Sequence, residues 1–171
     1  MDDLIVAGND SSAMSAFKEY LGHCFHIRDL GVLKYFLGVE VACSSEELFL
    51  SQHKYTLDII SEAGLLGSKP AAFPMEQNHT LALARGAEVR DPERYRRLVG
   101  RLIYLAFTRP NLAYLVHILA QFMQHPRQEH WDAALRVVRY LKGRPGQGIL
   151  LTSASDLSLT AGVIWIELVA R

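Results

Sequence analysis

Near the start of the chain, two short apolar runs typical of strands flank a segment whose apolar residues have helical spacing. An apolar run over 4–8 ends at a glycine and predicts a short buried strand, and a second strand is predicted near 25–28. Between them, apolar residues recur every three or four positions over about 12–22, behind Asp10 or Ser11, either of which can cap a helix. We therefore expect strand, helix and strand in this order.

A polar stretch at 44–47 separates two apolar segments, 33–43 and 48–51, which is typical of a β-hairpin. Ser51 then offers a cap for a further helix, and Gly64 ends it. The buried stripe expected on this helix consists of Tyr55, Ile59, Ile60 and Ala63.

The second half of the chain has the pattern of three amphipathic helices behind a linker. Residues 67–91 lack a clean period and contain prolines and glycines, which favours a linker or an extended crossing. Asp91-Pro92-Glu93 is a strong helix start, with a cap, a proline in the first turn and an acid near the positive end of the helix dipole. Helices are predicted at about 92–107, 111–124 and 128–142. Their expected core residues are Tyr95, Leu98, Leu102 and Leu105, then Leu112, Leu115, Leu119 and Phe122, and finally Trp131, Leu135, Val138 and Leu141.

A last short strand over 149–152 completes the predicted elements. They indicate an α+β fold, in which a strand and a hairpin with two helices precede a three-helix bundle. The segments expected on this basis are 1–66, 67–91, 92–144 and 145–171.

Composition changes this picture little, but the distribution of charge changes it substantially. Half of the residues are hydrophobic, and the formal net charge is zero. Residues 1–84 carry 5 basic and 11 acidic residues, whereas 85–144 carry 12 basic and 5 acidic ones, a net charge of +7. Eleven of those twelve bases are arginine, which contacts phosphate through a planar fork. A set of solvated helix faces would give the same count, so charge alone leaves both interpretations open.

Several other classes of protein are disfavoured. No apolar run approaches the roughly 18 residues that a membrane span needs, and the acidic start does not resemble a signal peptide. Two cysteines make no disulfide framework, and His23, Cys24 and His26 lack the second spaced ligand pair of a structural zinc site. We therefore expect an intracellular protein, cytoplasmic or nuclear, with no membrane partner and no zinc.

Asp2 and Asp3 are the sharpest acidic feature of the chain. Adjacent carboxylates in a tight turn can face a common Mg²⁺ site, because hard oxygen ligands suit a hard cation. An acidic pair near a terminus is more often simply solvated.

A series of short motifs in the middle and second half of the chain adds a more specific signal. In order along the chain they are Asp29-Leu30-Gly31, Tyr35-Phe36-Leu37-Gly38, Leu50-Ser51-Gln52 with Lys54-Tyr55, Tyr95-Arg96-Arg97-Leu98-Val99-Gly100 with Leu102 and Tyr104-Leu105, Thr108-Arg109-Pro110-Asn111, and Arg139-Tyr140-Leu141-Lys142-Gly143 with Gly148. The set closely resembles the copia-type retrotransposon reverse transcriptase, part of the Pol polyprotein, from about residue 1 to residue 152. Each motif is weak alone, but their joint occurrence in the family's order is highly specific.

The resemblance implies roles for the two aspartates. The family has a Tyr-x-Asp-Asp turn on a palm hairpin, and Asp2 and Asp3 match its two metal-binding aspartates, with Met1 at the variable position. The remaining metal aspartate of the family lies on an upstream palm strand that these 171 residues do not contain. Magnesium is thus the implied cofactor of the intact enzyme. The 171 residues alone are expected to bind none and to be catalytically incomplete, with Asp2 and Asp3 vestigial.

The resemblance also gives the segments names and a partner. Residues 1–66 correspond to the end of the palm and 92–144 to a thumb-like bundle, which in this family's relatives grips the RNA–DNA template–primer duplex. Arg94, Arg97 and Arg101 share one helix face and are the expected phosphate contacts, with Arg136 and Arg139 as a second, weaker pair. An ion pair between Asp132 and Arg136, four apart, is the plainer alternative for that pair.

The end of the sequence departs from the family. A ribonuclease H segment should begin there with an aspartate-rich strand, whereas 162–169 are apolar, as a frameshift near residue 161 would produce. The leading hypothesis is a retrotransposon RNA-directed DNA polymerase segment with residual template–primer binding, acting with the remainder of a Pol polyprotein if expressed. The alternatives are a non-enzymatic RNA- or protein-interaction module and a pseudogene product without a selected role.

Overall fold

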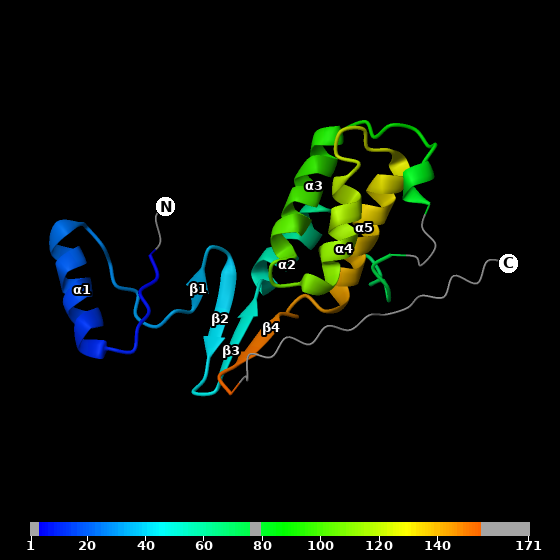
Figure 1. Ribbon diagram of the computed structural model, residues 1–171. Helices are drawn as coiled ribbons and strands as arrows, with labels where there is room; N and C mark the ends of the chain where they lie inside the picture. The colour runs from blue at the N-terminus through cyan, green and yellow to red at the C-terminus, as the bar shows by residue number, and fades with distance from the viewer. Residues whose placement is uncertain (1–3, 76–79, 155–171) are drawn as a thin grey trace.

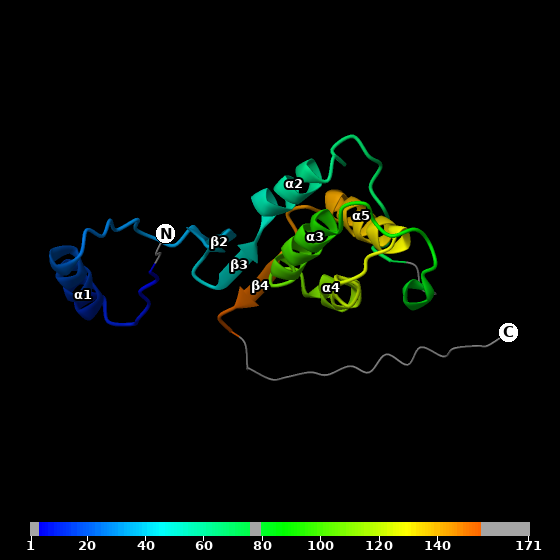
Figure 2. The same cartoon turned by 90° about the horizontal axis from the view of Figure 1, so that it is seen from above.

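The computed structural model describes residues 4–75 and 80–154, and Figure 1 shows their arrangement. The fold is α+β, as predicted, with a four-stranded antiparallel sheet and five α-helices. A cluster of helices packs together at one end, the sheet adjoins it, and the first helix lies apart on the far side of the sheet (Figures 1 and 2).

The first helix, α1 (Ser11–Cys24), confirms the expected cap, since the Asp10 carboxylate accepts hydrogen bonds from the backbone of Ser12 and Ala13. None of its residues is buried. The strands predicted at 4–8 and 25–28 are wrong, because both segments are irregular and largely exposed. A strand needs a neighbour for its backbone groups, and within the described residues neither segment reaches the sheet.

The sheet has the order β1-β2-β3-β4, with β1 (Tyr35–Phe36), β2 (Val39–Cys43), β3 (Glu47–Ser51) and β4 (Ile149–Thr152). The predicted hairpin and the predicted last strand are both confirmed. The first arm differs from the prediction, because it folds back on itself at Leu37 and Gly38, whose φ values are 46° and 83°. Positive φ at both central residues suits a tight two-residue turn, which splits the arm into β1 and β2.

Four helices enclose the hydrophobic core, namely α2 (His53–Glu62), α3 (Pro92–Leu105), α4 (Ala113–Ala120) and α5 (Gln128–Gly143). All four core residues predicted on α3 are buried, and Asp91 caps that helix through the backbone N–H of Arg94 at 3.0 Å. Of the four core residues predicted on α5, Val138 and Leu141 are fully buried, as expected. Ala134 and Val137 are fully buried there, whereas Trp131 and Leu135 are only partly buried.

The segment between α2 and α3 crosses the bundle, and several of its described residues are hydrogen-bonded to α5. The ammonium group of Lys142 donates to the carbonyls of Leu66 and Ser68, and the Ala71 N–H donates to the Arg139 carbonyl at 3.1 Å. Further along, the short 3₁₀ helix η1 (Leu81–Leu83) hydrogen-bonds to the buried imidazole of His130 through its Leu81 carbonyl, at 3.0 Å. The described helices include none long and apolar enough to cross a membrane.

Candidate nucleic-acid interface

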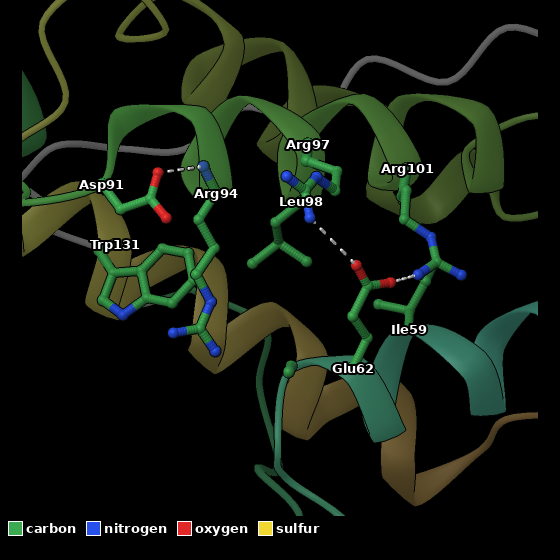
Figure 3. A pocket seen from close by; sticks show the side chains of 9 residues that line it. Ile59, Glu62, Asp91, Arg94, Arg97, Leu98, Arg101 and Trp131 are labelled. Atoms are coloured by element: carbon green, nitrogen blue, oxygen red, sulfur yellow. Dashed lines mark hydrogen bonds and ion pairs between the residues drawn. The ribbon is translucent and has the colours of Figure 1, made fainter.

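The arginines of α3 converge on one pocket, because residues three and four apart lie on the same side of a helix. Arg94, Arg97 and Arg101 project from α3 toward the end of α2 and the start of α5, and Figure 3 shows them together around a shallow pocket of about 140 Å³. The remaining lining residues come from all three helices and from the α3 cap: Ile59, Glu62, Ala63, Asp91, Leu98 and Trp131. The structure therefore brings the predicted arginine face together with two acidic residues, Glu62 and Asp91.

Arg101 is the most firmly held of the three arginines. Its guanidinium carbon lies 4.9 Å from the centre of the Tyr55 ring, and its Nη1 forms an ion pair with Glu62 Oε2. Its side chain is 21% exposed, which is consistent with a guanidinium that packs on an aromatic face while it reaches a carboxylate. The Tyr55 ring also packs edge-on against Tyr104, at 5.3 Å between centroids, and so fixes α2 against α3.

Arg97 and Arg94 are more accessible. Arg97 is 64% exposed, and its Nη1 lies 3.9 Å from Glu62 Oε1, at the outer limit of an ion pair. The Arg94 guanidinium carbon lies 5.1 Å from the centre of the Trp131 ring, while the Arg94 backbone receives the Asp91 cap. Both guanidinium groups are therefore open to a ligand that approaches from solvent.

The second predicted pair, Arg136 and Arg139, lies on α5 beneath the crossing segment. Arg136 Nε donates to the Phe73 carbonyl at 3.4 Å, and Arg139 is partly buried. Asp132, the alternative partner of Arg136, accepts a hydrogen bond from Gln128 at 2.9 Å. The structure thus separates the five predicted arginines into a pocket group on α3 and a group on α5 whose neighbours include the crossing segment.

Glu62, Tyr55 and Trp131 were not predicted as part of this site. Tyr55 and Trp131 have the spacing of core residues, and Glu62 is one acid among many. Their position at the pocket depends on how α2 and α5 pack against α3, which no local pattern encodes.

A profile described as reverse transcriptase (RNA-dependent DNA polymerase) matches residues 1–77. A retrovirus-related Pol polyprotein from transposon RE2 of Arabidopsis thaliana is 42% identical over 94% of this chain and 11% of its own length. An uncharacterized mitochondrial protein of the same plant is 34% identical over 94% of this chain and 67% of its own length. A putative transposon Ty5-1 protein of Saccharomyces cerevisiae is 31% identical, over 94% and 53% respectively.

The chain belongs to the copia-type retrotransposon reverse transcriptases. It corresponds to the reverse transcriptase region of a Pol polyprotein and spans about 11% of the RE2 Pol polyprotein. No solved structure matches it.

Two of the motifs that carry the resemblance to copia-type reverse transcriptases meet in the interior. The hydroxyl of Thr108, which is buried, donates to Gln52 Oε1 at 2.8 Å and so links the start of α2 to the end of α3. Arg109 is also buried and donates through Nη1 to the Arg144 carbonyl at 2.9 Å, just after α5. Burial lowers the pKa of the Arg109 guanidinium. Asn111 accepts a hydrogen bond from the Arg109 Nε through its Oδ1 and donates to the Tyr140 hydroxyl through its Nδ2, both at 3.4 Å. These motif residues therefore hold helices together.

The catalytic and metal-binding assignment of Asp2 and Asp3 lies outside the described residues. Reverse transcriptases of this family generally use Mg²⁺. From residue 4 to 75 and from 80 to 154, no three His, Cys, Asp or Glu side chains are grouped so that they could hold a metal ion. The described part of the chain offers a pocket lined by Arg94, Arg97 and Arg101.

Proposed function

We propose that this chain binds the backbone of an RNA–DNA template–primer duplex through the arginine pocket of α3 and contributes this grip to a longer reverse transcriptase. The observation that carries the proposal is the convergence of Arg94, Arg97 and Arg101 on one accessible pocket in a chain of this family. Guanidinium groups make forked, charge-assisted hydrogen bonds to phosphate oxygens. Because every nucleotide has the same phosphate, such contacts do not distinguish one base sequence from another. Binding is therefore expected to be independent of sequence and weak.

The proposal places the phosphate contact on α3 rather than α5. Arg94 and Arg97 are exposed, whereas Arg136 and Arg139 lie partly buried against the crossing segment. Arg101 is less exposed but lines the same pocket. Loss of the α3 arginines is thus expected to weaken duplex binding at constant fold.

Salt dependence of binding tests this directly, because each phosphate contact releases counterions and adds roughly 0.9 to the slope of log affinity against log salt for a B-form duplex. Anisotropy of a labelled RNA–DNA hybrid would be titrated with residues 1–171 over a range of NaCl concentrations. The variant Arg94→Ala/Arg97→Ala/Arg101→Ala should lower the slope by about two to three units.

The matched control removes three positive charges elsewhere, with Arg28→Ala/Lys34→Ala/Lys69→Ala, all at exposed positions away from the pocket. It should change the slope by less than about one unit, and circular dichroism should show parental helicity for both variants. If the α3 variant keeps the parental slope, the arginine face is an ordinary solvated surface and a role in protein interaction becomes the better proposal.

A further inference from the structure

The arginines of the α3 pocket already contact an anion of the protein itself, the carboxylate of Glu62. The two carboxylate oxygens of Glu62 face different guanidinium groups, with Oε2 paired to Arg101 and Oε1 3.9 Å from Arg97 (Figure 3). A carboxylate and a phosphate present similar pairs of oxygens to an arginine fork. The place of the Glu62 carboxylate between Arg97 and Arg101 therefore indicates where a phosphate would bind.

Glu62 is also able to leave that position. Its side chain is 49% exposed at the last residue of α2, and its carboxylate contacts are with side chains of α3. Arg101 keeps a second support in the Tyr55 ring, at 4.9 Å, when the carboxylate moves away. The exchange of one anion for another therefore leaves the guanidinium in place.

The other acid that lines the pocket has a different task. Asp91 Oδ1 accepts the backbone N–H of Arg94 at 3.0 Å as the cap of α3, and this contact is local to the helix start. Glu62 is thus the carboxylate that neutralises the pocket arginines, and the pocket of about 140 Å³ beside it has room for a group larger than one water.

We propose that Glu62 is an internal competitor that occupies the position of a backbone phosphate between Arg97 and Arg101, and that a duplex phosphodiester binds by displacing it. This inference rests on the proposed function of the same pocket. Exposed ion pairs are weak individually, so displacement is easy for a polyanion that delivers several phosphates at once and unfavourable for a single anion. Glu62 would thereby make the pocket selective for long nucleic-acid backbones.

Glu62→Gln tests this, since the amide keeps the shape of the side chain and removes its charge. The variant of residues 1–171 should bind the RNA–DNA hybrid about fivefold more tightly at moderate salt, because the ion pairs of Glu62 with Arg97 and Arg101 no longer oppose binding. Its salt slope should become steeper by up to about one unit, because the phosphate then releases free anions from the two arginines, whereas in the parent it releases only the tethered carboxylate.

The control is Asp58→Asn, which removes the same charge from an exposed position one turn earlier on α2, outside the pocket. It should leave the slope unchanged. In the Arg97→Ala/Arg101→Ala background, Glu62→Gln should have no effect on binding. The two arginines for which Glu62 and the phosphate compete are then absent.

The outcomes separate the two proposals. If the parent binds with an arginine-dependent slope but Glu62→Gln changes neither affinity nor slope, the competitor is overturned and the proposed function stands. If Glu62→Gln instead lowers the midpoint of thermal unfolding and leaves the slope unchanged, Glu62 is only a tie between α2 and α3, and the competitor is likewise overturned. Binding by Glu62→Gln where the parent binds nothing would support it. Failure of both proteins to bind would overturn both proposals.

Discussion

At the scale of single residues, Trp131 shows how one side chain serves both the core and the surface. Its ring is partly buried against the hydrophobic cluster, while its outer face carries the Arg94 guanidinium at 5.1 Å. The sequence predicted a core tryptophan, but the neighbouring His130 turns inward instead, stacking on Phe122 and hydrogen-bonding to Leu81. The tryptophan is thereby left at the pocket wall.

Trp131→Ala is expected to lower the free energy of unfolding by about 1–3 kcal/mol, below the roughly 3–5 kcal/mol of a fully buried aromatic residue, because part of the ring is already solvated. Denaturant unfolding followed by circular dichroism would measure it. Trp131→Phe, which keeps an aromatic face under Arg94, should lose less than half as much. A loss of more than about 4 kcal/mol would place the ring in the core and contradict the packing described for α5.

At the scale of elements, the parts that could be read from the sequence are those that local physics decides. The α1 and α3 caps, the α3 core face and β4 were all predictable, because a cap, an apolar stripe or a short apolar strand after a glycine is encoded in a few adjacent residues. The strands at 4–8 and 25–28 were wrong because a strand depends on a distant neighbour. The arginine face of α3 was predictable for the same local reason, whereas Glu62 entered the site only through the packing of α2 on α3.

The hydrogen bond between Thr108 and Gln52 allows the packing of α2 against the end of α3 to be measured by mutation. Thr108→Val keeps the side-chain shape but leaves the buried Gln52 Oε1 without its donor, and should cost about 1–3 kcal/mol of unfolding free energy. Gln52→Leu in the same chain should restore part of the loss, because it removes the stranded amide altogether. A double-mutant cycle from denaturant unfolding gives the coupling energy, and independent, additive losses would show that the two motifs do not cooperate.

At the scale of the whole molecule, the pairing of β4 with β3 connects two distant segments of the described chain. Ile149 pairs with Leu50 on β3. The last strand of the sheet therefore comes from a segment that follows α5 in the chain, long after β3. The helices that line the basic pocket, α2, α3 and α5, lie between β3 and β4 in the chain. Duplex binding by this pocket is therefore expected to depend on the pairing of β4 with β3.

Polymerisation by the 171 residues alone is the last prediction. Phosphoryl transfer by two metal ions requires carboxylates that hold the ions about 3.5–4 Å apart. The family pattern assigns Asp2 and Asp3 to this task together with an aspartate from a strand that the 171 residues do not include, and residues 4–75 and 80–154 supply no group of three such ligands. Residues 1–171 should therefore show no primer extension on an RNA template with Mg²⁺ or Mn²⁺, under conditions in which an intact copia-type reverse transcriptase is active and in which residues 1–171 still retard the hybrid. Template-dependent extension that disappears in Asp2→Ala/Asp3→Ala would show that two carboxylates suffice, and would make this chain a polymerase in its own right.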